Sequence, residues 1–94
     1  MNINPADLIK ATAGREKGKY FMVLCVSDDY VMICDGKGRT VNKPKKKKIK
    51  HIKYLDYSLT RIRKKLEEGK QINNSEIRKE IRLFKESLDF SVMG

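Results

Sequence analysis

The chain has 94 residues and a net charge of +10, from 22 Lys and Arg against 12 Asp and Glu. A chain of this length fits one domain with a modest core, because folding buries roughly 60–65% of the surface that the unfolded chain exposes. No apolar stretch approaches the ~20 residues that a membrane-spanning helix needs, and none follows Met1 as a signal peptide would require. We therefore expect a cytoplasmic protein whose charge attracts a polyanion.

Short runs of strand-forming residues alternate with turn signals through the first half of the chain. Leu8–Thr12 is the first strand candidate, and Tyr20–Val26 and Tyr30–Cys34 are continuous apolar runs that each follow a turn signal. Arg39–Asn42 and Ile49–Lys53 make two more short strands. Five short strands within about 45 residues, separated by glycine-rich turns, are typical of a small curled sheet or an SH3-like barrel.

The two cysteines, Cys25 and Cys34, lie inside the two apolar runs. If these runs pair around the turn between them, Cys25 lies opposite Met32 and Cys34 lies opposite Val23. The cysteines then sit diagonally, so we expect core packing and no disulfide. No close set of Cys and His offers four metal ligands, so we expect neither a metal nor a cofactor.

Helical spacing replaces the strand pattern after residue 57. Leu59, Ile62 and Leu66 recur at i, i+3 and i+7, which marks one face of a helix. Ser58 is expected to cap its start and Gly69 to end it.

A second amphipathic helix is indicated at roughly Ser75–Leu88, and the short linker before it favours a helical hairpin. The fold class that we expect is α+β, mainly β. Residues 1–57 form a small SH3-like barrel, and residues 58–94 form a C-terminal two-helix segment packed on or beside it, as a single compact domain. The apolar positions of the second helix recur at i, i+4, i+7 and i+11: Ile77, Ile81, Phe84 and Leu88.

Three basic clusters are the candidate functional residues. Residues 1–53 hold 13 Lys and Arg against 5 Asp and Glu, whereas residues 54–94 hold 9 against 7. Concentrated lysine and arginine bind phosphates with an affinity that falls steeply with salt, and they read backbone rather than sequence. A solvated surface is the alternative, but the lysine run is internal and two other clusters lie on neighbouring turns. We expect the clusters in loops or at strand ends on one side of the barrel: Arg15, Lys17 and Lys19; Lys37 and Arg39; and Lys43, Lys45, Lys46, Lys47, Lys48, Lys50 and Lys53, with His51 as a strand-surface or RNA-stacking residue.

The order of these motifs resembles a known family. The run Gly-Arg-Glu-Lys-Gly-Lys at residues 14–19, followed by an apolar strand, resembles a KOW motif. Residues 10–16, 31–36, 41–45 and 49–52, taken in order, are similar to the KOW-domain ribosomal proteins of the L-fourteen-e, L-six-e and L-twenty-seven-e group. The resemblance implies an SH3-like (KOW) barrel that binds ribosomal RNA through its loops. It implies phosphate contacts at Arg15, Lys17 and Lys19, and turn roles at Gly14 and Gly18. A separate tight turn is predicted at Gly36 from the Asp35-Gly36 pair itself.

The sequence therefore predicts an RNA-binding protein, a monomer that works as a ribosomal or ribosome-associated ribonucleoprotein component in translation. Its partners are ribosomal RNA and the ribosome or its proteins. A protein-interaction module of the transcription-elongation (NusG-like) type stays open, with apolar strand residues and the Ile77–Leu88 helix face as its contact surface. No paired carboxylates, nucleophile–base pair or P-loop is present, so we expect no enzyme. We expect no membrane partner either, because no apolar-faced basic helix accompanies the lysine run.

Overall fold

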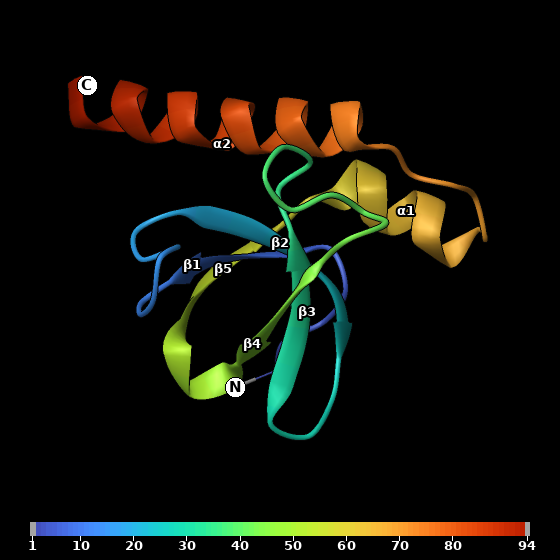
Figure 1. The fold of residues 1–94 in the computed structure, drawn as a ribbon. Coiled ribbons are helices and arrows are strands. Elements are labelled where there is room, and N and C mark those ends of the chain that lie inside the picture. The colour runs from blue at the N-terminus through green and yellow to red at the C-terminus, as the bar shows by residue number, and fades with distance from the viewer. Residues whose placement is uncertain (1, 94) are drawn as a thin grey trace.

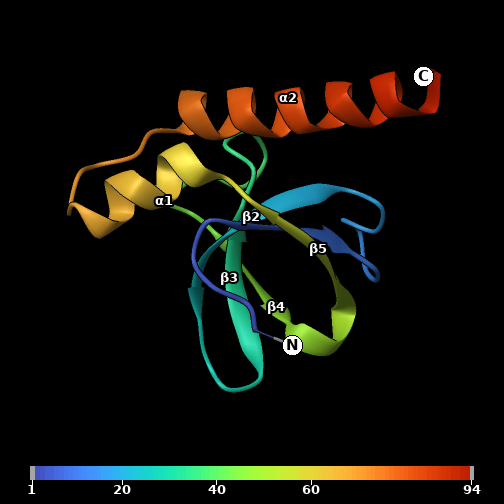
Figure 2. The same cartoon turned by 180° about the vertical axis from the view of Figure 1, so that it is seen from behind.

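The computed structural model describes residues 2–93, with side chains for residues 2–88. Its centre is one antiparallel sheet that curls into a small barrel, with two helices lying across one side (Figures 1 and 2). This arrangement confirms the expected α+β fold class. The strand order in the sheet is β4-β3-β2-β1-β5, and the strands are β1 (Asp7–Ala11), β2 (Tyr20–Val26), β3 (Tyr30–Cys34), β4 (Lys45–Lys48) and β5 (Ile52–Ser58).

The second half of the sheet differs from the sequence prediction. Arg39–Asn42 is not a strand, since only an isolated bridge joins Thr40 to Lys43 there. The strand is instead the lysine run Lys45–Lys48, which we expected as a connection. It pairs with β3 along its whole length, so tertiary pairing overrides the low strand propensity of lysine. The expected strand Ile49–Lys53 is a single 3-10 turn, Ile49–His51, followed by the start of β5.

A bulge in β2 changes the predicted register. Cys25 lies opposite Met32 as expected, but Cys34 lies opposite Met22 rather than Val23, because the register shifts between Val23 and Cys25. Cys34 is buried and Cys25 is exposed, so the expected packing in the core is confirmed for Cys34 and wrong for Cys25. Both thiols are free.

The sheet has apolar side chains on both faces. Side chains alternate along each strand, and the central strands β2 and β3 are continuous apolar runs. One set fills the barrel interior, with Ile9, Phe21 and Ile33 among its fully buried members. The other set, which includes Leu8 and Met22, faces outward. That outer face is covered by the helices, whose buried side chains join the same cluster: Ile62, Ile77, Ile81 and Phe84.

The first helix, α1, spans Thr60–Glu67. Ser58 does not cap it, contrary to expectation, because Ser58 is the last residue of β5 and Leu59 occupies the cap position without a side-chain hydrogen bond. Gly69 ends it as expected, with a φ of 71° and an amide that donates to the Leu66 carbonyl.

The second helix, α2, spans Asn74–Met93, so it begins one residue earlier and continues further than the spacing predicts. Asn73 caps it reciprocally: its side-chain oxygen accepts from the Glu76 amide, while the Glu76 carboxylate accepts from the Asn73 amide, both at 2.9 Å. Glu76 also pairs with Lys65 of α1, which ties the two helices together.

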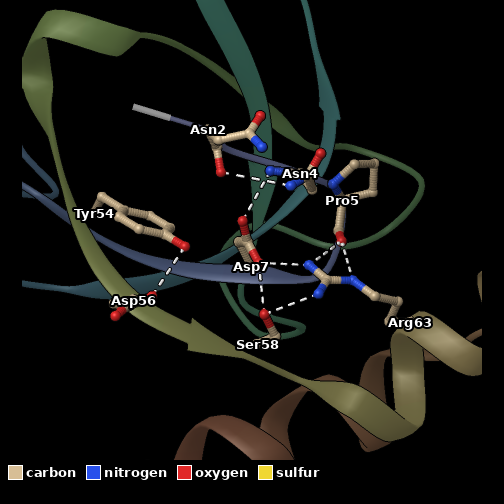
Figure 3. Close-up of polar contacts among 8 residues, drawn as sticks. All are labelled: Asn2, Asn4, Pro5, Asp7, Tyr54, Asp56, Ser58 and Arg63. Atoms are coloured by element: carbon tan, nitrogen blue, oxygen red, sulfur yellow. Dashed lines mark hydrogen bonds and ion pairs between the residues drawn. The ribbon is translucent and has the colours of Figure 1, made fainter.

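A polar clasp holds α1 against the start of the chain (Figure 3). The carboxylate of Asp7, only 1% exposed, accepts hydrogen bonds from the Ser58 hydroxyl at 2.7 Å and from the Asn4 amide at 2.8 Å. The guanidinium of Arg63 donates to the same carboxylate, to the Ser58 hydroxyl and to the Pro5 carbonyl. One arginine therefore joins the start of the chain to the junction of β5 and α1, more than 50 residues away in sequence.

The loop between β3 and β4 is fixed to the first turn of α2. The Arg78 guanidinium donates to the Gly36 carbonyl at 2.6 Å, and the Val41 amide donates to the Asn74 side chain at 2.9 Å. Gly36 has a φ of 77°, and a Cβ at this position would lie 2.3 Å from the Asn74 carbonyl oxygen. Only glycine fits this contact. Gly36, predicted as a turn residue, therefore also allows the start of α2 to pack closely against the loop.

Candidate nucleic-acid interface

The expected basic residues fall on three neighbouring parts of the barrel. These are the β1–β2 loop (residues 12–19), the β3–β4 loop (residues 35–44) and the segment from β4 to the start of β5 (residues 45–53). Gly14 and Gly18 give the β1–β2 loop its shape, with φ values of 79° and 86°, as expected for turn glycines. Nine of the basic side chains are exposed to solvent: Arg15, Lys17, Lys19, Lys37, Lys43, Lys46, Lys48, Lys50 and Lys53.

A buried carboxylate joins the first two loops. Glu16 is 6% exposed, and its carboxylate accepts a hydrogen bond from Arg39 of the β3–β4 loop at 2.9 Å. Lys45, at the start of β4, lies 3.7 Å from the same oxygen. Burial acts to raise the pKa of Glu16, but the Arg39 hydrogen bond, a backbone hydrogen bond and the charges of Lys45 and Lys47 outweigh it and leave the pKa below its usual value. Glu16 therefore stays ionised and holds two basic loops together.

A buried lysine makes the second connection. Lys47 is 8% exposed, and its ammonium donates to the Ala13 carbonyl of the β1–β2 loop at 2.7 Å. A buried ammonium needs such a partner, because removing a charge from water is costly when it stays unpaired. Lys47 thus supports the shape of the loop rather than offering its charge to solvent.

Alternation along β4 divides the lysine run into two pairs. Lys45 and Lys47 share the face that contacts the β1–β2 loop, whereas Lys46 and Lys48 are exposed on the other face. The Lys46 ammonium lies 4.2 Å from the centre of the Tyr30 ring, a cation–π contact that orients it. We expected all four lysines in a loop or at a strand end, but in the strand only Lys47 is buried, Lys45 is half-exposed beside Glu16, and the outward pair is fully open to a partner.

The 3-10 turn brings the third segment to the base of the same loop. The Thr12 amide donates to the His51 carbonyl at 2.9 Å, next to the exposed Lys50. Lys53 of β5 lies directly opposite Lys10 of β1. In this contact His51 acts through its backbone carbonyl rather than through its imidazole.

Comparison with models of known protein families and with curated protein sequences finds no match for this chain. Within residues 2–93, no helix has the length and apolar character needed to cross a membrane. Among the described residues, no group of three or more His, Cys, Asp and Glu side chains could hold a metal ion.

The structure separates residues that organise the site from residues that face solvent. Arg39, Lys45 and Lys47 are engaged by Glu16 and the Ala13 carbonyl, so they hold the loops in place. Sequence reasoning missed Glu16 as the organiser. The sequence does contain a signal for this role, because Glu16 is the one acidic residue in the basic turn of residues 13–19. Lys10, on the strand that precedes this turn, was missed as well.

Proposed function

We propose that this protein binds RNA through the exposed lysines and arginines of the β1–β2 loop, the β3–β4 loop and β4. One observation carries the proposal. The contacts of Glu16, together with the Lys47–Ala13 hydrogen bond, gather basic segments that are up to 34 residues apart in sequence onto adjoining parts of the barrel. A preorganised set of cations neutralises several phosphates without the entropic cost of first ordering flexible loops.

Ribosomal RNA is the partner that we propose, on or near the ribosome. The resemblance of residues 7–53 to KOW-domain ribosomal proteins supports it, as does the concentration of lysine on loops and an edge strand of a small barrel. Such a surface contacts phosphates and therefore recognises the shape of the RNA backbone rather than its sequence.

A protein-docking function has less support in the structure. The apolar face of α2 would be the contact surface, but Ile77, Ile81 and Phe84 are buried in the cluster that joins the helix to the sheet. These three side chains are not available to another protein while the helix stays in place, and of the predicted face only Leu88 is exposed.

The test is RNA binding measured between about 50 and 200 mM salt, with a labelled ribosomal RNA hairpin and a non-cognate RNA duplex. The variant Lys46→Gln/Lys48→Gln removes the outward pair of β4. The variant Lys64→Gln/Lys70→Gln removes the same charge from exposed positions on and after α1. For each phosphate that the β4 variant no longer neutralises, we expect about five- to eightfold weaker binding to the hairpin at 0.1 M salt, with a smaller salt slope. The α1 variant should stay within about twofold of the wild type.

Two results would contradict the proposal. If the wild type shows no salt-sensitive binding to either RNA, the basic surface serves another partner. If it binds both RNAs equally and weakly, ribosomal RNA is not its specific partner and the lysines form a generic polyanion surface.

A further inference from the structure

The charges of α2 are distributed unevenly around the helix. Its buried stripe consists of Ile77, Ile81 and Phe84. The residue after each of these lies about 100° further round the helix, and all three are basic: Arg78, Arg82 and Lys85. We call these three residues the basic flank. The opposite side of the buried stripe holds Glu76 and Glu80, which line a hollow shared with α1 together with Lys79.

The basic flank begins at the β3–β4 loop. Arg78 donates to the Gly36 carbonyl at 2.6 Å, which places it beside the exposed Lys37. Because a helix rises 1.5 Å per residue, the flank then runs about 10 Å along α2 to Lys85. Arg82, midway, forms an ion pair with the exposed Glu86 at 3.9 Å. A surface pair at this spacing is worth about 0.3–0.5 kcal/mol, so a phosphate displaces it readily.

The flank ends where α2 meets the start of β2. The Lys85 ammonium lies 5.8 Å from the centre of the Tyr20 ring, and the Lys10 ammonium of β1 lies 5.6 Å from the same centre. The Tyr20 ring itself packs edge-on against Phe84, with 5.5 Å between the ring centres. Ammonium groups from the helix and from the sheet therefore converge on one aromatic ring, and Lys10 continues the row to Lys53 on the next strand.

We infer that the RNA-binding surface continues from the barrel onto the basic flank of α2, where Arg78, Arg82 and Lys85 contact the phosphate backbone of the same RNA. This inference rests on the proposed function and adds a second element to it. The flank is joined to the barrel at both ends, by the Arg78–Gly36 hydrogen bond and by the Lys10–Tyr20–Lys85 contact. A phosphate chain that leaves the β3–β4 loop can pass Arg78, Arg82 and Lys85 in turn on its way to Lys10, once it displaces Glu86 from Arg82.

RNA fits this surface better than an anionic membrane does. A basic helix that lies in a lipid interface buries its apolar stripe in the acyl chains. Here Ile77, Ile81 and Phe84 are already buried against the sheet, and the exposed Leu83 lies on the acidic side of the helix. Of the apolar stripe only Leu88, at 39%, is exposed beside the basic flank, and a single leucine is far less than the apolar face that such a helix inserts into lipid.

The test compares two double variants of the full chain that remove the same charge. Arg82→Gln/Lys85→Gln removes two members of the basic flank, and Lys64→Gln/Lys79→Gln removes two exposed lysines elsewhere on the helices. For each phosphate that the flank variant no longer neutralises, we expect about five- to eightfold weaker binding to the ribosomal RNA hairpin at 0.1 M salt, and a salt slope lower by about 0.7–0.9. The control should change by less than about twofold. Thermal melting of both variants checks that each is folded.

A photo-crosslinking residue placed at Arg82, and separately at Lys79, gives an independent readout on the wild-type background. Crosslinking to the hairpin from the first position and not the second supports the inference. If the β4 variant weakens binding while the flank variant does not, and crosslinking is equal at both positions, α2 is outside the interface and only this inference fails. If neither the β4 variant nor the flank variant weakens RNA binding, the proposed function and this inference both fail. If the flank variant instead loses binding to phosphatidylserine vesicles and keeps its affinity for RNA, the flank is a lipid surface and the inference is overturned.

Discussion

Replacing Glu16 by glutamine tests whether one carboxylate organises the basic loops. The side chain keeps its size and can still accept a hydrogen bond, but it loses the charge that faces Arg39 and Lys45. Hydrogen bonds to charged groups are worth about 1.5–3 kcal/mol and neutral ones about 0.5–1.5 kcal/mol. Because Arg39 and Lys45 are 39% and 37% exposed, solvent screening places the loss at about 1 kcal/mol. For a domain of this size that lowers Tm by about 4–8 °C.

The effect should also depend on pH in a definite direction. The pKa of Glu16 in the folded protein lies below its ordinary value of 4.5, so the folded state favours the ionised form. Its contribution to stability is complete above the unfolded pKa and is lost as the pH falls through the folded pKa. The difference in Tm between wild type and Glu16→Gln is therefore full at neutral pH and shrinks as the pH drops below about 4.5.

Thermal melts followed by circular dichroism across this pH range provide the measurement. Glu67→Gln is the matched control, since it makes the same charge change at an exposed position on α1. Equal melting of the two variants at neutral pH would show that Glu16 does not hold the loops together. A difference that persists unchanged in acid would show that the charge of the carboxylate is not the cause.

Three further outcomes follow from the fold. Arg63→Lys should cost about 1–2 kcal/mol in urea denaturation, because one ammonium cannot replace the several hydrogen bonds of the guanidinium; no loss would show that the clasp is not structural. Gly36→Ala should cost at least about 1–2 kcal/mol for the left-handed backbone alone, and should speed amide exchange in the first turn of α2, because its Cβ meets the Asn74 carbonyl oxygen; unchanged exchange would contradict that contact. Burial and the charge of the neighbouring aspartate raise the pKa of Cys34 to about 12, so iodoacetamide at neutral pH should label only Cys25 in the folded protein and both thiols after unfolding.

The sequence predicts the sheet well where side chains themselves favour strands. Tyr20–Val26 and Tyr30–Cys34 have the bounds expected from their apolar runs and flanking turns. β4 was missed because four consecutive lysines carry no strand pattern, and only pairing with β3 makes them one. The cap of α1 was missed because Ser58 has a better partner in the distant Asp7, which local sequence cannot show.

The candidate site is likewise only partly predictable from the sequence. Composition reveals the basic charge, and the loops that carry it are marked by glycine. Which lysines face solvent depends on the alternation along β4, and this strand was not visible in the sequence. The role of Glu16 depends on a contact 23 residues away, and the alignment of Lys85 with Lys10 depends on how α2 packs. Such features arise from tertiary structure, so no local pattern predicts them.

The position of β4 has a consequence for the behaviour of the protein at high concentration. β4 forms one edge of the sheet, and among residues 2–93 no strand pairs with its outer side. An open edge is a template for strand addition by a second copy, and lysines at an edge oppose it by electrostatic repulsion. Lys46 and Lys48 are therefore placed to oppose aggregation, a role that needs no ligand. Salt screens this repulsion, so conditions that would weaken the proposed phosphate binding also reduce the protection of the open edge.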